Sequence, residues 1–273
     1  MQDLAKDIVR QSLAPVLWVI SDDSSNDKTW SIIEYLEEKF SWIRGVRLEP
    51  HQDGEYAHGR YAEVVNQGFK NATEFCKKHD FRYDFLAVVD ADVRLENRYF
   101  EKLIKAFQTD PRLGIASGLV YEKEMPVSEV QRSNAEPRGC ALVFRRECLE
   151  MIGGFQGHTN SLVKARNRNW TVEVVPSAKV FHQRRSWLRK NYFLTAGMYA
   201  YLSDYHPLNA FLTGAFYVVR LSPRMGLYYL QGYITSFVTR KEKTEDEEIK
   251  EYYRSSFNRL LERISEKLRQ IEL

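Results

Sequence analysis

Acidic residues stand in pairs at two places in the sequence, and their type and spacing suit a metal or phosphate site. Asp22 and Asp23 follow one apolar run, and Asp90 and Asp92 follow a second. Ligands of open α/β sheets lie at the carboxyl ends of the strands, so we expect these side chains at one edge. Carboxylates gathered there repel each other unless a cation joins them, and hard oxygen ligands favour Mg²⁺ or Mn²⁺ bridging to a diphosphate. The alternative is that such acids only cap helices, as we expect of Asp27.

The elements that must position these acids follow from the alternation of apolar runs with helical patterns. Continuous apolar runs predict buried strands, and apolar residues three and four apart predict helices. The expected strands are 16–20, 46–48, 85–89, 114–120, 140–144 and 172–175. The expected helices are 3–13, 29–40, 61–77, 97–107, 147–152 and 162–168. This order predicts an α/β fold, with a mixed, mostly parallel sheet and helices on both faces.

Composition narrows the class of protein. The 273 residues are 44% hydrophobic and 28% charged, as is typical of globular proteins. The 40 Lys and Arg residues against 37 Asp and Glu residues give a net charge of +3, so charge does not indicate a nucleic-acid partner. Cys76, Cys140 and Cys148 lack CxxC spacing, which argues against a disulfide framework or zinc knuckle. Residues 1–10 lack the apolar core of an export signal, so a cytoplasmic location is predicted.

The carboxyl-terminal part of the chain differs in composition. Residues 187–240 are helical in pattern and rich in Tyr, Phe and Leu, with Lys and Arg at the flanks. Each apolar stretch is shorter than the roughly 18–20 residues that span a bilayer, so the segment either packs on the core or contacts the inner face of a membrane peripherally. Residues 241–273 predict a charged, amphipathic terminal helix. The remaining residues, 1–186, are expected to form the α/β domain.

Five segments of the sequence occur in an order found in a known enzyme family. VLWVISDDSSNDKTWSII is an apolar strand followed by acids and a helix, and FLAVVDADVRLENRYFEKLI carries a DXD element. GRYAEVVNQGFKNA, RGCALVFRRECLEMIGGF and VEVVPSAKVFHQRR correspond to a connecting helix, a segment ending in GGF and a closing pair of strands. Together these segments resemble the family 2 glycosyltransferases over residues 3–187.

The resemblance implies a GT-A fold that binds a sugar linked to UDP or GDP at the carboxyl edge of the sheet. It implies that Asp23 contacts the base, that Asp90 lies on the ribose side, and that Asp92 holds a Mg²⁺ or Mn²⁺ ion that neutralises the diphosphate. The residues implied in nucleotide-sugar binding are Asp22, Asp23, Arg60, Asp90 and Asp92, and those implied in metal binding are Asp92 and His182. The alternatives are a solvated arginine at a helix start for Arg60 and a structural histidine for His182.

The chain departs from the family pattern at two places. Family members begin with a strand of the type VSVVIPTYN, whereas residues 1–15 are helical in pattern, so we expect either a chain that starts late or a sheet with one strand fewer. After GGF, inverting members carry an acidic base, but no carboxylate stands between Glu150 and Glu173. His158 could accept a proton there, or it is a loop histidine. An acceptor that is already an anion, such as polyprenyl phosphate, would need no base.

These features predict a metal-assisted transfer of sugar to a glycan or polyprenyl-phosphate acceptor, with inversion. Residues 183–187 read QRRSW, so Ser186 replaces the arginine of the QxxRW motif of processive synthases, and a non-processive enzyme is expected. Two alternatives stay open. One is a GT-A scaffold protein without activity, and the other is a phosphatase of the haloacid-dehalogenase type, whose first strand also ends in DxD. The donor sugar, the base of the nucleotide and the oligomeric state do not follow from the sequence.

Overall fold

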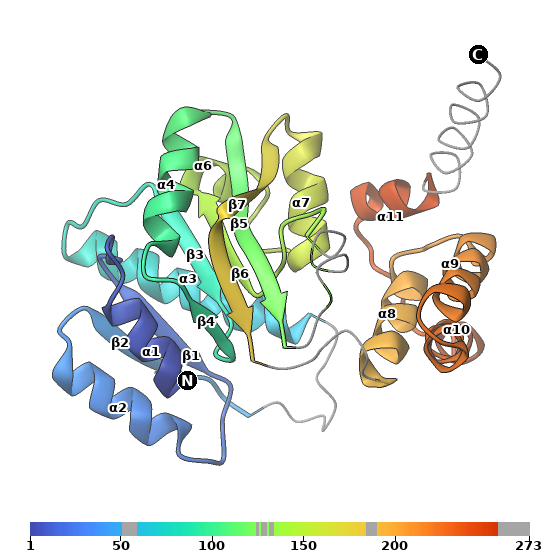
Figure 1. Ribbon diagram of the computed structural model, residues 1–273, viewed down its shortest axis with the longest axis horizontal. Coiled ribbons are helices and arrows are strands. Elements are labelled where there is room, and N and C mark those ends of the chain that lie inside the picture. Colours follow the sequence, from blue (N-terminus) through green and yellow to red (C-terminus); the bar gives the residue numbers. More distant parts are fainter. Residues whose placement is uncertain (51–58, 124–125, 127–129, 131–133, 184–189, 256–273) are drawn as a thin grey trace. The chain divides into compact units, whose positions relative to one another are not determined.

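The structure, a computed structural model, describes residues 1–50, 59–123, 126, 130, 134–183 and 190–255. The chain divides into two compact units, Met1–Arg184 and Arg185–Leu273 (Figure 1). The described elements of the first unit are α1 (Gln2–Val9), β1 (Trp18–Asp22), α2 (Thr29–Lys39), β2 (Ile43–Arg47), α3 (Arg60–Lys78), β3 (Phe85–Val89), β4 (Val93–Leu95), α4 (Tyr99–Thr109), β5 (Leu113–Glu122), β6 (Ala141–Arg145), α6 (Arg146–Met151), α7 (His158–Asn167) and β7 (Thr171–His182).

The strands of the first unit form two sheets. β1 and β2 pair in parallel, with Trp18 opposite Ile43. The other strands form a sheet of order β3-β6-β5-β7-β4. In this sheet β5 and β7 are parallel, whereas β3 with β6, β5 with β6, and β4 with β7 are antiparallel. The α/β class and the mixed sheet are thus confirmed, but parallel pairing among the described strands is limited to two pairs. β6 runs antiparallel to both of its neighbours, β3 and β5, so the sheet is less parallel than expected.

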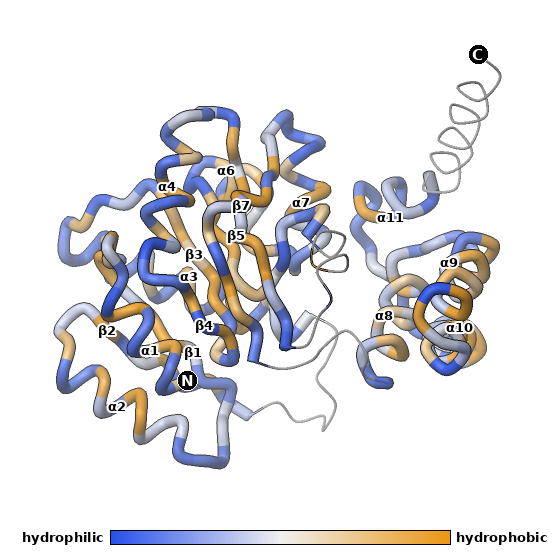
Figure 2. The backbone as a smooth tube through the Cα atoms, viewed as in Figure 1, coloured by the Kyte–Doolittle hydropathy of each residue, from blue (hydrophilic) through white to orange (hydrophobic). Residues whose placement is uncertain are grey.

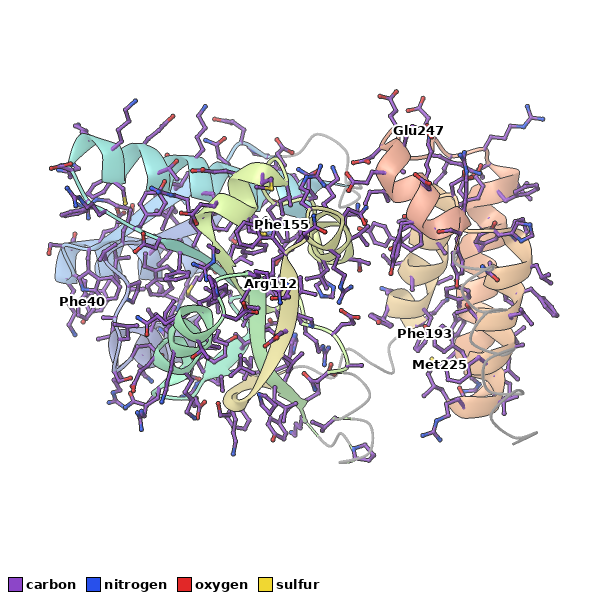
Figure 3. The ribbon with its side chains drawn as sticks, turned by 90° about the horizontal axis from the view of Figure 1, so that it is seen from above. Phe40, Arg112, Phe155, Phe193, Met225 and Glu247 are labelled. Atoms are coloured by element: carbon purple, nitrogen blue, oxygen red, sulfur yellow. The ribbon has the colours of Figure 1, made fainter. Side chains whose placement is uncertain are left out.

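Helices cover both faces of the five-stranded sheet. On one face α1 and α4 pack against β4, β5 and β7, where Tyr99 and Phe107 of α4 are buried. On the other face α3, α6 and α7 pack against β3, β5 and β6, where Phe155 is buried (Figure 3). The neighbouring residues Ile115 and Ala116 of β5 belong to these two different cores, as the alternation of side chains along a strand requires.

A tight passage between β5 and β7 fixes the register of the sheet. The pairing shifts between Gly118 and Leu119. A side chain at Gly118 would bring a Cβ within 2.6 Å of the Ala178 carbonyl oxygen and of the Tyr99 ring. The Tyr99 hydroxyl accepts a hydrogen bond from Gly118 N at 3.1 Å and donates one to Ala141 O at 2.8 Å. Glycine is therefore required at position 118, and Tyr99 links β5 with β6.

α3 packs on both sheets and thereby relates β1 to β3. On its β1 side, Gly68 lies so close to Ser21 that a Cβ would be 2.7 Å from the Ser21 Oγ. On its other side, Phe69 meets Phe144 of β6 in a T-shaped ring contact. Among the described strands, β1 pairs only with β2, whereas β3 pairs only with β6. The side chain of Ala87 in β3 is exposed. The carboxyl ends of β1 and β3 are thus positioned by one helix rather than by direct pairing.

Most expected elements of the first unit are present. The strand 85–89 is β3 without change, and the helices 29–40 and 61–77 are α2 and α3 within one residue at each end. Asp27 accepts a hydrogen bond from Thr29 N at 2.8 Å, as expected of a residue at a helix start. β4 was not expected, α7 begins at His158 rather than at 162, and β7 continues from 175 to His182. The chain before β1 is helical, as predicted for residues 3–13, although α1 ends at Val9.

The second unit contains helices in the segments predicted to be helical. They are α8 (Lys190–Leu202), α9 (Pro207–Arg220), α10 (Pro223–Val238) and α11 (Glu247–Arg254). Phe193 of α8 is buried in the core that α8, α9 and α10 share, and Met225 of α10 packs against it (Figure 3). α11 is the beginning of the expected terminal helix, and the rest of that prediction, from 256 onward, lies outside the described residues. The predicted boundaries at 186 and 240 stay predictions. No helix in the described ranges is long and apolar enough to cross a bilayer.

Candidate functional site

The two acidic pairs are linked by consecutive residues at the start of α3. Arg60 donates hydrogen bonds to Asp23 Oδ1 through Nε, at 3.0 Å, and through a terminal nitrogen. Tyr61 donates its hydroxyl to Asp90 Oδ1 at 2.8 Å. One turn of helix thus contacts the acid that follows β1 and the acid that follows β3. The structure therefore brings Asp23 and Asp90 to the same region, as their positions after two strands predicted.

Arg60 is a paired and largely buried cation. Only 8% of the residue is exposed, and besides Asp23 it contacts Glu63 at 3.1 Å and the Glu49 carbonyl oxygen at 3.0 Å. Hydrogen bonds to Asp23 and then to Glu63 raise the pKa of Arg60, so it remains charged. The picture of a solvated arginine at a helix start is therefore wrong. Its fixed charge holds Asp23 in place at the end of β1.

Asp90 is a carboxylate in a poorly hydrated position. Burial raises its pKa, and the neighbouring charge of Asp92 raises it further, while the hydrogen bond from Tyr61 and the charge of His182 act in the opposite direction. The backbone N–H of Asp90 donates to Cys140 O at 2.9 Å, which ties the end of β3 to the start of β6. A carboxylate held this way gains from any ligand that brings hydrogen-bond donors or a cation.

Asp92 and His182 face each other across the β4 and β7 pairing. His182 Nε2 lies 3.7 Å from Asp92 Oδ1, and the Asp92 carbonyl oxygen accepts a hydrogen bond from Gln183 N at 3.0 Å. Val93, the first residue of β4, is directly opposite His182. The long strand β7 therefore delivers His182 to the DXD segment, which the resemblance implied. The basic residues Arg184 and Arg185, and the rest of the 184–187 motif, lie outside the described residues.

Asp92 and His182 fit a metal whose remaining coordination positions are filled by a phosphate and water. Within the described ranges, no group of three or more His, Cys, Asp or Glu side chains is arranged to hold a metal by itself. Mg²⁺ keeps several waters and is usually bound by one or two carboxylates together with substrate phosphates, so a full protein cage is not needed. The Asp92 carboxylate beside the His182 imidazole, with the poorly hydrated Asp90 two residues away, therefore suits a divalent cation that arrives with a diphosphate.

Asp22 has different surroundings from Asp23. Its side chain is 1% exposed, with Arg47 Nε at 3.5 Å from Oδ2, and its Oδ1 accepts a hydrogen bond from Ser25 N at 3.3 Å. The Asp22 carbonyl oxygen accepts from Leu48 N at 2.9 Å. Asp22 thus fixes the turn after β1 against β2. Its implied role in nucleotide binding stays a prediction, and the contacts seen here support the loop that carries Asp23.

A buried ion pair next to His182 was not found from the sequence. Glu122, whose side chain is fully buried, accepts a hydrogen bond from Arg138 at 2.6 Å, and it is opposite His182 in the β5 and β7 pairing. Arg138 N also donates to Ser117 Oγ at 3.2 Å. The pair therefore supports the strand that carries His182. The acid at the end of the apolar strand 113–122 was the available signal, since it repeats the pattern of Asp90.

His158 is held by its surroundings. It begins α7, its ring packs near Gly139, and its Nε2 donates to the Pro137 carbonyl oxygen. Burial lowers its pKa, so it stays neutral at physiological pH. A neutral ring that donates through Nε2 has no lone pair at that nitrogen for an acceptor proton. His158 is neither a loop residue nor an available base at Nε2, and its observed role is to connect α7 to the segment before β6.

The GGF segment is attached to α3 by a reciprocal pair of hydrogen bonds. Asn66 donates to Phe155 O and accepts from Phe155 N, both at 2.8 Å. Gly154 has a φ of +87°, and a Cβ there would be 2.9 Å from the Asn66 side chain. Phe155 in turn meets Tyr61 edge to face. The Asn and the GGF residues that carried the resemblance thus support Tyr61 from behind.

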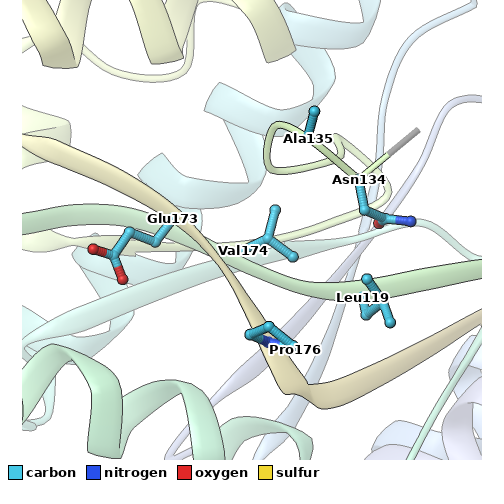
Figure 4. Close-up of a pocket in the computed structure, with 6 residues that line it drawn as sticks. All are labelled: Leu119, Asn134, Ala135, Glu173, Val174 and Pro176. Atoms are coloured by element: carbon cyan, nitrogen blue, oxygen red, sulfur yellow. The ribbon is translucent and has the colours of Figure 1, made fainter. Parts of the chain in front are cut away.

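A cavity of about 550 Å³ opens on the sheet away from the acidic pairs. It is lined by Leu119, Asn134, Ala135, Glu173, Val174 and Pro176, beside the irregular pairing of β5 and β7 (Figure 4). The Glu173 carboxylate points away from Leu119 and Pro176 (Figure 4). None of the predicted site residues lines this cavity, and its walls are mainly apolar. It therefore adds nothing to the site at the ends of β1 and β3.

Comparison with known proteins agrees with this geometry. The model of the family described as "Glycosyl transferase family 2" matches residues 2–166, more than half of the chain. The chain belongs to glycosyl transferase family 2. This membership confirms the predicted glycosyltransferase, and it favours that interpretation over the phosphatase.

Individual relatives of this family 2 glycosyltransferase are more distant. Over 98 residues the chain is 30% identical to a glucans biosynthesis glucosyltransferase H from Shewanella sp. (strain ANA-3), a match that covers 36% of this chain and 13% of the relative. The same protein from Shewanella baltica (strain OS155) matches equally, so the chain corresponds to a small part of these relatives. Among solved structures, a mannosyltransferase from Pyrobaculum calidifontis in complex with GDP-Man and Mn²⁺ aligns with a TM-score of 0.55 at 16% identity, covering 87% of this chain and 71% of that one. The GT-A fold is thereby confirmed.

Proposed function

We propose that this family 2 glycosyltransferase moves a sugar from a UDP- or GDP-linked donor to an acceptor hydroxyl or phosphate at the ends of β1 and β3. The observation that carries the proposal is the start of α3, where Arg60 contacts Asp23 and Tyr61 contacts Asp90. Two separate acidic motifs are joined there by adjacent residues. The structural relative from Pyrobaculum calidifontis, described with GDP-Man and Mn²⁺, supports a nucleotide sugar and a divalent metal.

The contacts suggest a separate role for each acid. Asp23, fixed by Arg60, accepts a hydrogen bond from the base of the nucleotide, with Asp22 supporting its loop. Asp90, oriented by Tyr61, accepts from the ribose hydroxyls, whose donors compensate for its poor hydration. Asp92 and His182 would hold Mg²⁺ or Mn²⁺. When bound, the metal supplies a positive charge that neutralises the diphosphate leaving group.

The chain's own residues position the donor and exclude water around it. The acceptor oxygen attacks the anomeric carbon, the bond from that carbon to the diphosphate oxygen breaks, and the nucleoside diphosphate leaves. A single displacement of this kind inverts the configuration. A neutral hydroxyl acceptor must lose its proton during the reaction, and a general base normally takes it. No carboxylate stands between Glu150 and Glu173, and His158 Nε2 is already engaged with Pro137.

These facts favour an anionic acceptor such as polyprenyl phosphate over a neutral glycan. A phosphate oxygen carries its own negative charge, so no side chain has to remove a proton. A polyprenyl acceptor lies in a membrane, so the proposal includes peripheral contact with the inner face of that membrane. Transfer of a single sugar to such an acceptor is also what a non-processive enzyme performs.

The donor site is tested by calorimetric titration with UDP and GDP, each with and without Mn²⁺. We expect binding of one nucleotide to require the metal in the wild-type chain and to be lost in Asp92→Asn. The control is Asp80→Asn, an exposed aspartate with a positive φ of 55°, a conformation that asparagine also tolerates. Binding that is equal with and without metal, or that survives Asp92→Asn, would contradict the roles given to these residues. No binding of either nucleotide would favour a scaffold protein.

The acceptor class is tested separately by transfer of labelled sugar from the donor that binds. Polyprenyl phosphate should be glycosylated faster than neutral oligosaccharides at equal concentration. Preference for a neutral sugar hydroxyl would show that a base exists and would overturn the acceptor proposal. The donor site would be unaffected by that result.

A further inference from the structure

The outer faces of α9 and α10 are apolar and exposed. On α9, five large apolar residues spaced at one helical face are each 41–89% exposed: Leu208, Phe211, Leu212, Phe216 and Val219. On α10, three more at spacings of seven and four residues are 55–70% exposed: Leu227, Ile234 and Val238. We call these eight residues the hairpin face. α9 is coloured as hydrophobic along most of its length (Figure 2). Such contiguous apolar surface on a helix marks an interaction site.

The inner faces of the same helices combine buried aromatic residues with glycines at points of close contact. A Cβ at Gly197 of α8 would overlap the Tyr229 carbonyl oxygen, and one at Gly226 would overlap the Gly214 carbonyl oxygen, so the three helices touch backbone to backbone. Asn209 of α9 is also buried. The core of these helices is already filled by buried side chains such as Tyr229 and Tyr233, so the large apolar side chains of the hairpin face lie outside it. Helices that associate in lipid also use small residues at their interfaces to approach closely.

The charges around the hairpin face match an anionic surface. Residues 190–240 contain Lys190, Arg220, Arg224 and Arg240 but a single acid, Asp204. That acid is paired with Lys243 and, at 2.5 Å, with Arg254. The four cations are exposed. Basic residues beside an apolar helix face are the pattern of helices that lie in the interface of membranes with anionic lipids.

Charge and length also restrict how the hairpin could meet a bilayer. Arg220 and Arg224 flank the turn between α9 and α10, so the turn itself is too polar to enter hydrocarbon first. α9 has 14 residues and α10 has 16, which gives helices of about 21 and 24 Å against a hydrocarbon core of about 30 Å. The acids of residues 242–251 follow α10, and α11 packs through Tyr253 against Tyr205 at the other end of α9. The helices therefore suit a position in the plane of the interface, where Arg220 and Arg224 can contact the headgroups.

We infer that the hairpin face docks on the surface of a membrane containing anionic lipids, with α9 and α10 lying in the plane of the interface. A second copy of the chain or another apolar protein would also bury the apolar stripes. Only a lipid surface accounts at once for the exposed apolar stripes, the exposed cations and the near absence of acids. The inference rests on the proposed function in one respect, namely that docking would bring the enzyme to a polyprenyl acceptor in the membrane. Docking is measured without any substrate, so the two can fail independently.

The test is co-sedimentation of the full chain with vesicles of phosphatidylcholine, alone or mixed with phosphatidylglycerol. We expect the wild-type chain to bind the mixed vesicles and Phe216→Asp to lower the partition coefficient about tenfold or more, since a phenylalanine that would enter the membrane is replaced by a charge. The matched control is Met151→Asp in the first unit, because Met151 and Phe216 are equally exposed, at 54%. This control should bind as the wild type does. Both variants change surface residues, and circular dichroism will verify that each is folded.

A second arm tests the charges. Arg220→Gln and Arg224→Gln should each weaken binding to mixed vesicles about fivefold and leave binding to pure phosphatidylcholine unchanged, whereas Arg112→Gln in the first unit should have no effect on either. A wild-type chain that stays in solution with every vesicle would overturn the inference. Equal loss in Phe216→Asp and Met151→Asp would also overturn it. So would a lipid-free dimer that Phe216→Asp dissociates.

Discussion

The hydrogen bond that Tyr61 donates to Asp90 stabilises the negative charge of this poorly hydrated carboxylate. Tyr61→Phe removes only the hydroxyl, because the ring keeps its edge-to-face contact with Phe155. A hydrogen bond to a charged group contributes about 1.5–3 kcal/mol, and one between neutral groups about 0.5–1.5 kcal/mol. We therefore expect the variant to lose about 1.5–3 kcal/mol of unfolding free energy at pH 8, where Asp90 is ionised, and about half of that in acid, where Asp90 is protonated.

The assay is urea denaturation followed by tryptophan fluorescence at several pH values. Four of the five tryptophans, Trp18, Trp30, Trp42 and Trp170, belong to the first unit, so the signal reports the unit that contains the site. The pKa of Asp90 is raised by burial, so the change between the two regimes should lie above the usual range of an aspartate. Tyr35→Phe, at an exposed tyrosine, is the control and should have little effect.

The decisive feature is the dependence on pH. In an Asp90→Asn background the effect of Tyr61→Phe should no longer change with pH, because the titrating partner is gone. A destabilisation by Tyr61→Phe that is the same at pH 8 and in acid would refute the link between this hydroxyl and the charge of Asp90. So would a loss below about 0.5 kcal/mol at pH 8, the lower limit for an ordinary hydrogen bond.

Three further variants test the structure around the site. Asp90→Asn should be more stable than the wild type at pH 8 and should lose nucleotide binding. Because the pKa of Asp90 is raised in the folded chain, its ionisation lowers the stability of the wild type as the pH rises through that pKa, so the advantage of the variant should vanish in acid. Thermal melts at both pH values test this, and an advantage that persists in acid would contradict it. Gly118→Ala should cost about 1–3 kcal/mol, since the new Cβ would meet the Ala178 carbonyl, and urea midpoints unchanged from wild type would refute the close approach. Glu122→Gln should cost about 2–3 kcal/mol, less than a fully buried pair because the Arg138 side chain keeps 22% exposure, and a neutral effect in the same urea assay would contradict a structural ion pair.

Much of the fold of the first unit could be predicted because its strands are continuous apolar runs. Phe85–Val89 and the helix that becomes α3 have patterns that leave little choice of structure. β4, at Val93–Leu95, is too short to show a pattern of its own, and it exists because β7 pairs with it. The mixed direction of the sheet also depends on which strands become neighbours, and local patterns do not contain that information. The expected strand ended at 175, directly before Pro176. In the structure β7 continues past Pro176, because its pairing with β5 is irregular at this point.

The site was predictable in its acids but not in their supports. Asp23, Asp90 and Asp92 stand at the ends of strands, a position that has meaning in the sequence alone. Tyr61 could have been suspected only from its place beside Arg60, and its partner Asp90 is 29 residues away. The burial of Arg60 and the neutral state of His158 are properties of surroundings assembled from distant segments. Sequence patterns therefore located the chemistry, and the packing of α3 defines how each group is held.

The most direct measurement of the proposed donor site is electron paramagnetic resonance of Mn²⁺ titrated with the chain. Asp92 and His182 supply only two protein ligands for the metal. We therefore expect the free Mn²⁺ signal to fall little with protein alone and to fall strongly once UDP or GDP is added. Asp92→Asn should abolish that fall, and Asp80→Asn should not. Tight Mn²⁺ binding without nucleotide, or a nucleotide-dependent loss of signal that Asp92→Asn leaves intact, would show that the metal and diphosphate are held elsewhere.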